Sequence, residues 1–247
     1  MNGSSKAILL IADISGYTRF MQLHTISTSH AKLIIVRLLK SLMRASKPPL
    51  KIAELEGDAV FFYALASDGN VKKTAGLVKE QVVRFFSAFN KEIAKLDQMD
   101  TCVCDACTRV ADLKLKQVIH VGDVAIEKIQ KFEKLFGIDV ILVHRMLKNS
   151  VPSGEYVMMT DRLYQNLGDF YGLDPERRKE TFEGVGEVET LVFYPSRFGE
   201  SVGMAKTEEA RPFWPARIFW AVTTLCQTVL DLGGLRKIKG AFNNLPA

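Results

Sequence analysis

Two aspartates at the ends of apolar segments have the type and setting that phosphate chemistry requires. Asp13 follows the continuous apolar run of residues 7–12, and Asp58 lies between strand-like runs at residues 51–55 and 59–65. The two acids are forty-five positions apart, but adjacent strands can bring such residues together. Paired carboxylates hold the hard cations that neutralise a triphosphate and activate an attacking oxygen. Turn capping is the alternative role for aspartates at strand ends.

The elements that must position these acids follow from the hydrophobic periodicity. Residues 7–12 predict a buried strand, and residues 31–45 predict a helix that ends before Pro48-Pro49. Glu56-Gly57-Asp58 suits a hairpin with the second acid at its tip. Further helices are expected at residues 76–96, 139–148 and 161–167, and further strands at residues 113–120, 124–129, 156–159 and 189–194. This order predicts an α/β (α+β) fold, a mixed sheet covered by helices in the ferredoxin-like manner.

The composition of the chain predicts one main domain and an appendage. The 247 residues are 47% apolar and 25% charged, and the pattern changes near residue 197, so we expect a domain at 1–197 and a linker with a helical tail at 198–247. The net charge of +5 comes without a long basic tract, which argues against a nucleic-acid partner. The N-terminus lacks the pattern of a secretory signal, so we expect a cytoplasmic protein.

Four segments resemble motifs of the class III nucleotidyl cyclases, in the order of that family. ADISGYTRF (12–20) resembles the segment with the first metal aspartate, and ELEGDAVFF (54–62) resembles the Gly-Asp hairpin with the second. LKQVIHVGDVAI (115–126) resembles the central strand, and FGIDVILVHRML (136–147) resembles the helix that carries a transition-state arginine. The chain resembles still more an uncharacterised bacterial cyclase-related family that has the same His-Arg helix and a Cys-rich loop.

The resemblance implies a role for each matching residue. Asp13 and Asp58 would bind two Mg²⁺ or Mn²⁺ ions per site, and Arg145 would steady the transition-state phosphate, which a planar guanidinium contacts with two N–H groups. The family shares each site between two protomers, so the resemblance implies a homodimer that converts a nucleoside triphosphate to a 3′,5′-cyclic nucleotide and pyrophosphate. The turn that would contact the phosphates comprises Ile14, Ser15, Gly16, Tyr17 and Thr18.

Two departures from the family pattern support an alternative function. Ile141 stands where the family has an asparagine four residues before the arginine, and Glu183 stands where it has a lysine. Losing one preorganised donor costs on the order of 10²-fold in rate if nothing replaces it. The alternative is therefore a catalytically degenerate nucleotide-binding or regulatory module with the cyclase fold.

The positions that select the base also differ from those of adenylate-type members. Glu54 lies three residues before the hairpin glycine, and Lys134 lies three residues before Gly137. Glutamate accepts hydrogen bonds from guanine or from the amino group of cytosine, and lysine donates to a carbonyl oxygen. This pair favours guanine or a pyrimidine over adenine, unless the two side chains pair with each other.

A cysteine cluster and an apolar tail complete the sequence features. Cys102, Cys104 and Cys107 can supply three thiolates to a structural Zn²⁺, with Cys226, His120 or a partner residue as the fourth ligand. An unliganded, redox-sensitive cluster is the alternative. Residues 213–232 predict an amphipathic helix that would contact an anionic membrane peripherally or, alternatively, pack on the domain.

Overall fold

The computed structural model describes residues 4–22, 25–66, 70–99, 105–195 and 222. Its strands are β1 (Ser5–Ser15), β2 (Lys51–Glu56), β3 (Ala59–Leu65), β4 (Lys114–Ile129), β5 (Phe132–Phe136), β6 (Tyr156–Thr160), β7 (Glu176–Phe182) and β8 (Gly186–Phe193). Its helices are α1 (Tyr17–Met21), α2 (Thr25–Ala45), α3 (Val71–Met99), α4 (Asp105–Thr108), the 3₁₀ helix η2 (Val110–Asp112), α5 (Ile138–Arg145) and α6 (Asp161–Leu167).

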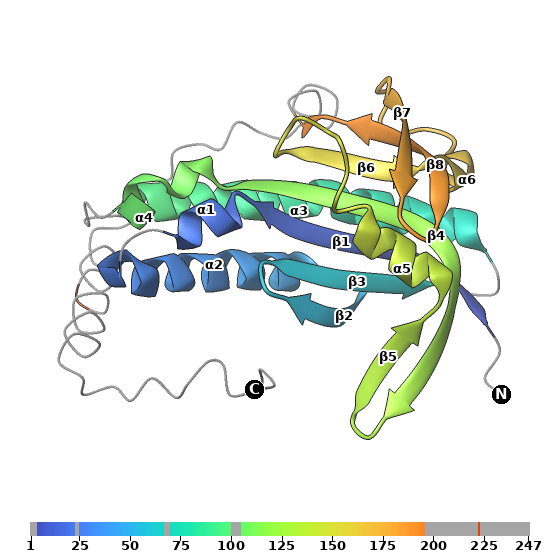
Figure 1. Ribbon diagram of the computed structural model, residues 1–247, viewed down its shortest axis with the longest axis horizontal. Coiled ribbons are helices and arrows are strands. Elements are labelled where there is room, and N and C mark those ends of the chain that lie inside the picture. Colours follow the sequence, from blue (N-terminus) through green and yellow to red (C-terminus); the bar gives the residue numbers. More distant parts are fainter. Residues whose placement is uncertain (1–3, 23–24, 67–69, 100–104, 196–221, 223–247) are drawn as a thin grey trace.

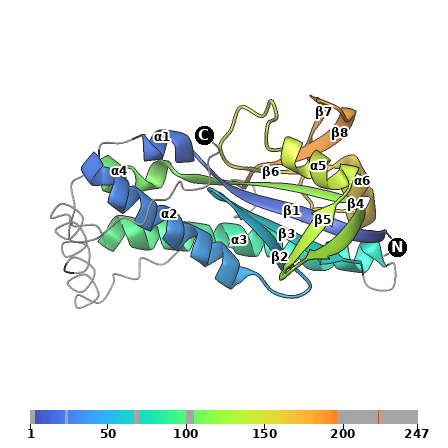
Figure 2. The same cartoon turned by 60° about the horizontal axis from the view of Figure 1, so that its bottom comes forward.

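A mixed eight-stranded sheet forms the centre of the domain. Seven strands follow the order β2-β3-β1-β4-β6-β8-β7, β5 pairs with β4 alone, and β4 and β6 run parallel. The long helices α2 and α3 cover one face of the sheet, and α5 lies on the other (Figures 1 and 2). Because β1 lies between two strands with helices on both faces, residues 7–12 are completely buried, which explains their uninterrupted apolar run.

The β4–β5 hairpin extends beyond the body of the domain as an arm (Figure 1). Its tip turns through Gln130, which has a φ of 56°. Ile129, Phe132 and Phe136 on this arm are between 46% and 62% exposed, although large apolar side chains are normally buried. The arm is therefore a candidate surface for contact with another molecule.

The mixed α/β fold predicted from the sequence is confirmed, with differences in individual strands. The strands expected at 113–120 and 124–129 form the single strand β4. The structure adds β5 and β7, which the periodicity did not indicate. The boundary expected near residue 197 and the tail, apart from Val222, lie outside the described residues. Within the described part of the chain, no helix is both long and apolar enough to cross a membrane.

Candidate functional site

The structure brings the two predicted metal ligands together at the edge where β1 ends. Asp13 lies opposite Ala59 in the antiparallel β1–β3 pair, and the Ile14 N–H donates to the Asp58 carbonyl at 3.1 Å. Burial and the neighbouring Asp13 carboxylate raise the pKa of Asp58 to about 6. The two carboxylates therefore repel each other, and a bound cation would relieve this repulsion.

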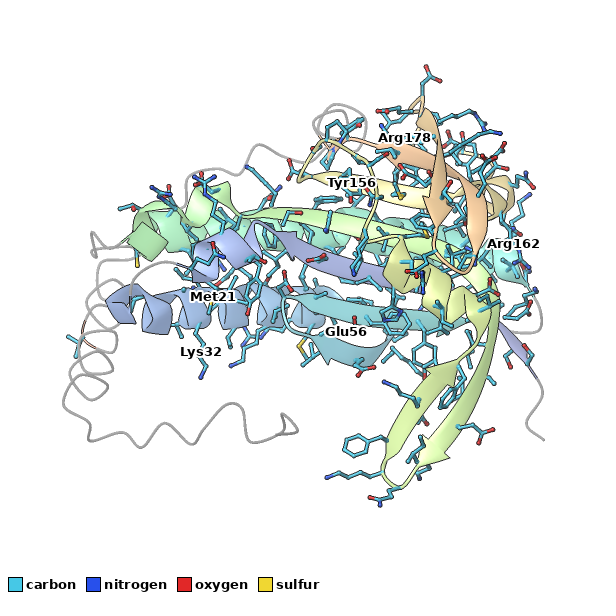
Figure 3. All side chains as sticks on the ribbon, viewed as in Figure 1. Met21, Lys32, Glu56, Tyr156, Arg162 and Arg178 are labelled. Carbon is cyan, nitrogen blue, oxygen red and sulfur yellow. The ribbon has the colours of Figure 1, made fainter. Side chains whose placement is uncertain are left out.

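Lys116 is a third charged member of this site, and the sequence motifs did not single it out. Its ammonium lies 3.1 Å from Asp13 Oδ2, and the two side chains are only 20% and 13% exposed. Lys116 is the register partner of Asp13 on β1 and of Tyr156 on β6, so the three residues form a row across the sheet (Tyr156 is labelled in Figure 3). The signal that could have identified Lys116 is the antiparallel register of β1 and β4, which the sequence does not specify directly.

The predicted phosphate-contacting turn, Ile14–Thr18, follows Asp13 directly. Ile14 and Ser15 are the last residues of β1; Ile14 packs in the core and its N–H donates to the Asp58 carbonyl, so it offers no donor to a phosphate. Gly16 has a φ of 87°, a conformation that favours glycine, and the short helix α1 begins one residue later. Ser15 Oγ is buried and has no hydrogen-bond partner among the described residues. The turn therefore holds one unsatisfied polar group beside the carboxylates.

Arg145, the predicted transition-state arginine, is the last residue of α5 and pairs with Glu183. Arg145 Nη1 donates to Glu183 Oε2 at 3.1 Å. Glu183 is the first residue of the turn between β7 and β8, and its side chain is 93% exposed. Ile141, one helical turn before Arg145, is 48% exposed. The two departures from the cyclase pattern therefore both lie next to Arg145.

The predicted base-selecting residues line a cavity of about 340 Å³ between β2, β5 and α5. Lys134 Nζ lies 2.5 Å from Glu54 Oε2, so the two side chains pair with each other. A second pair, which the sequence motifs missed, joins His144 Nε2 to Glu56 Oε1 at 2.7 Å (Glu56 is labelled in Figure 3). The lining residues are Ala53, Glu54, Glu56, Phe61, Glu133, Lys134, Leu135, Val140 and His144. The cavity thus combines hydrogen-bonding groups with an apolar and aromatic wall, which suits a nucleobase.

The cysteine cluster is only partly described. Cys107 is buried, and its Sγ lies 3.5 Å from His30 Nδ1. His120, which the sequence offered as a zinc ligand, instead uses both ring nitrogens, on Thr160 Oγ1 and Asp139 Oδ1 at 2.9 Å each. Cys102, Cys104 and Cys226 lie outside the described residues. Among the residues that are described, no group of three or more His, Cys, Asp or Glu side chains forms a metal cluster.

Comparisons with known proteins match the chain to one family and one fold. The family model described as "Protein of unknown function (DUF2652)" matches residues 35–156. The chain is 38% identical over 156 residues to the "Uncharacterized protein Rv2561/Rv2562" of Mycobacterium tuberculosis (strain ATCC 25618 / H37Rv), a match that covers 63% of this chain and 71% of the relative.

Among solved structures, the chain is similar to two cyclases. The adenylyl cyclase CyaB from P. aeruginosa has 14% sequence identity and a TM-score of 0.57, over 78% of this chain and 96% of that chain. The guanylyl cyclase Cya2 has 15% identity and a TM-score of 0.55, over 77% of this chain and 92% of that chain. At these identities the likeness establishes the fold, which is that of the class III cyclases.

Proposed function

Because the chain belongs to the DUF2652 family of proteins of unknown function and has the class III cyclase fold, we propose that it is a nucleotidyl cyclase-like protein. In this proposal it converts a nucleoside triphosphate to a 3′,5′-cyclic nucleotide and pyrophosphate at the interface of a homodimer. The observation that carries the proposal is the close approach of Asp13 and Asp58 at the end of β1. Similar structures support the fold alone, so the activity rests on this site.

The acid pair fits Mg²⁺ or Mn²⁺ that arrives with a nucleotide. Two carboxylates are too few to enclose a cation by themselves, but Mg²⁺ commonly uses one or two carboxylates together with substrate phosphates. The raised pKa of Asp58 supports this fit, because burial first and the Asp13 carboxylate second disfavour its negative charge, and a divalent cation would offset both. When bound, two such cations would neutralise the triphosphate and activate the 3′-hydroxyl.

The other residues of the site have roles that follow from their charge and position. The 3′-oxygen attacks the α-phosphorus, the bond to pyrophosphate breaks, and the proton of the 3′-hydroxyl leaves to solvent or a nearby base. Lys116 is close enough to Asp13 to contact the same phosphates. The Ile14 N–H already donates to the Asp58 carbonyl, so the donors of this segment to phosphate oxygens would be the backbone N–H groups of Gly16, Tyr17 and Thr18. Arg145 of a second protomer would complete the site.

Exposed apolar side chains support the homodimer in this proposal. Single exposed apolar residues are common, but contiguous ones mark contact surfaces. The exposed large apolar residues on β2, on the β4–β5 arm and at the start of α5 are Ile52, Leu55, Ile129, Phe132, Phe136, Ile138 and Ile141. A partner that covers them would also bring its own Arg145 to the neighbouring face.

The cavity lining suggests guanine or a pyrimidine as the base. Glu54 and Glu56 offer carboxylate acceptors, and their partners Lys134 and His144 offer nitrogen donors. The Glu54–Lys134 pair is nearly half exposed, so a base with complementary donors and acceptors can replace it at low cost.

A second candidate function is a nucleotide-binding module without turnover. It is favoured by the Arg145–Glu183 pair. This pair places the Glu183 carboxylate beside the arginine that would bind the triphosphate, at a position where a positively charged side chain would assist turnover. Such a module would keep the acid pair for binding and signal through its conformation.

Incubation of the purified protein with each of the four ribonucleoside triphosphates and Mn²⁺ or Mg²⁺ tests the proposal. A cyclase yields a cyclic nucleotide detected by mass spectrometry, and the Asp58→Asn variant yields none. Binding without product supports the second candidate. Absence of both binding and product contradicts both candidates.

A further inference from the structure

We propose that Glu183 is a specificity-determining residue that lowers the affinity of the site for ligands with many negative phosphate charges. This inference rests on the proposed function, because it concerns the Arg145 that would contact the triphosphate. Glu183 would act in two ways: it competes with phosphate for the arginine, and it repels the phosphates themselves.

The geometry of the β7–β8 turn holds Glu183 against Arg145. The Val185 N–H donates to the Phe182 carbonyl at 3.0 Å and closes the turn. Gly184 has a φ of 72°, and a Cβ atom added to it would lie 3.9 Å from Arg145 Nη2. The backbone of the turn therefore passes beside the guanidinium, so Glu183 is next to Arg145 because of its place in the fold.

The exposure of the two partners determines how strongly they interact. Glu183 is 93% exposed and Arg145 is 36% exposed, and ion pairs between exposed groups contribute little to stability. A phosphate group can therefore displace Glu183 from Arg145. The displaced carboxylate stays on the same short turn, where it repels every further negative charge on the ligand. The effect should grow from a monophosphate to a diphosphate to a triphosphate.

A neutral substitution of Glu183 tests this inference, and Glu187 provides a matched control. Glu183→Gln removes the negative charge without adding a positive one. Glu187 lies on the same β7–β8 hairpin, is 60% exposed, and pairs with Lys179 at 3.1 Å, the same distance as in the Arg145 pair. Glu187→Gln therefore makes the same change in net charge but leaves Arg145 untouched.

The measurement is calorimetric binding of inorganic tripolyphosphate and of a nucleoside mono-, di- and triphosphate, each with Mn²⁺. We expect Glu183→Gln to bind the triphosphate and tripolyphosphate about three- to tenfold more tightly, since removing a competing exposed pair and its repulsion acts on this scale. The gain should be smaller for the diphosphate and smallest for the monophosphate. Arg145→Ala should abolish most of the gain, and Glu187→Gln should show none.

The outcomes separate this inference from the proposed function. If the unmodified protein binds nucleotide but Glu183→Gln binds no more tightly than Glu187→Gln, the inference is overturned and the proposed function stands. A gain of undiminished size in the Arg145→Ala background, or one that is equal for all phosphate lengths, also overturns it. If neither tripolyphosphate nor any nucleotide binds to any variant, the proposed function and the inference both fail.

Discussion

Three charged side chains at the end of β1 are held in a partly buried setting that leaves one negative charge unbalanced. Lys116 pairs with Asp13 at 3.1 Å. Asp58 lies beside Asp13, and its pKa of about 6 reflects burial first and the neighbouring negative charge second. Without a bound cation the ionised Asp58 is therefore unfavourable for folding at neutral pH. A residue with this property is more useful for binding than for stability.

Asp58→Asn should stabilise the protein alone and abolish its stabilisation by Mn²⁺ and nucleotide. The pKa of Asp58 is higher in the folded protein than the unfolded value of about 3.9, so its contribution to stability falls as the pH rises from about 4 to 6. The neutral amide avoids this cost, which we put at about 1–2 kcal/mol after allowing for solvent screening. Thermal unfolding at pH 7.5 should show a midpoint higher by a few degrees.

Asp169→Asn is the matched control for this substitution. The Gly172 N–H and Lys79 lower the pKa of Asp169, so its negative charge is favoured in the folded protein, unlike that of Asp58. Removing this charge should therefore give no gain in stability. A destabilised Asp58→Asn protein that still responds to Mn²⁺ and nucleotide would contradict the metal assignment.

Binding of Mn²⁺ should weaken at acid pH with a midpoint near 6. A cation binds the ionised carboxylate, so below the pKa of Asp58 a proton must first be displaced. The apparent affinity should fall up to about tenfold for each pH unit below 6 and stay nearly constant above it. Titrations between pH 5 and 8 measure this dependence, and a flat profile across that range would exclude Asp58 as a ligand.

Short sequence motifs singled out candidate site residues but not the side chains that they contact. Asp13, Asp58 and Arg145 lie within recognisable local motifs, so their roles could be inferred from short segments. Lys116, Glu183 and His144 acquire their significance from contacts with residues distant in the sequence. Register across the sheet and the position of the β7–β8 turn determine these contacts, and neither is encoded locally.

At the scale of elements, α5 is joined to β4 by a partly buried polar network at its first turn. Asp139 accepts hydrogen bonds from His120 and from the Asp123 N–H. The Asp139 side chain lies directly over Gly122, where an added Cβ atom would approach it to 2.2 Å. A glycine at position 122 is thus required by the close approach of α5, and α5 in turn carries Arg145.

Gly122→Ala should destabilise the domain by about 1–3 kcal/mol, the usual cost of forcing an extra group into a packed site. Gly76→Ala is the control, because an added Cβ on Gly76 meets nothing within 4 Å and alanine is about 1 kcal/mol better than glycine within a helix such as α3. Urea unfolding of both variants measures the two effects. Equal stabilities for the two variants would show that the packing of α5 on Gly122 is unimportant.

The long periodic elements were predicted from the sequence, whereas the strands β5 and β7 were not. The apolar run of β1 and the helical repeats of α2 and α3 can be recognised in the sequence, because burial of these elements determines where their apolar residues fall. The β7 sequence ERRKETF has few apolar residues, and it is a strand because it pairs along β8 at the sheet edge. The strand β5 has five residues, and β4 is its only strand partner in the sheet.

At the scale of the whole molecule, one chain presents two incomplete halves of the proposed site. The acid pair and Lys116 lie at the end of β1, whereas Arg145 is engaged with Glu183 on another element. The exposed apolar residues of the β4–β5 arm and α5 offer a surface on which a second copy can pack. A closed two-fold dimer would contain two equivalent sites, each with acids from one protomer and arginine from the other.

Mixing two inactive variants should restore activity if the site is shared in this way. Asp58→Asn removes a metal ligand from one half, and Arg145→Ala removes the arginine from the other, where we expect a loss of about 10²-fold in turnover. A heterodimer of the two variants has one intact site and one doubly defective site. With random exchange, half of the dimers are heterodimers, so the mixture should recover about a quarter of the unmodified activity.

A mixture of Asp58→Asn with Asp13→Asn is the control, because both changes affect the same half of the site and no intact site can form. Native mass spectrometry of differently tagged protomers establishes that heterodimers are present in each mixture. Activity in the first mixture and none in the control supports the shared site. Where the unmodified protein is active and heterodimers form, absence of recovery in the first mixture excludes a site built from two protomers. Arg145 would then have to act within its own chain, away from its contact with Glu183.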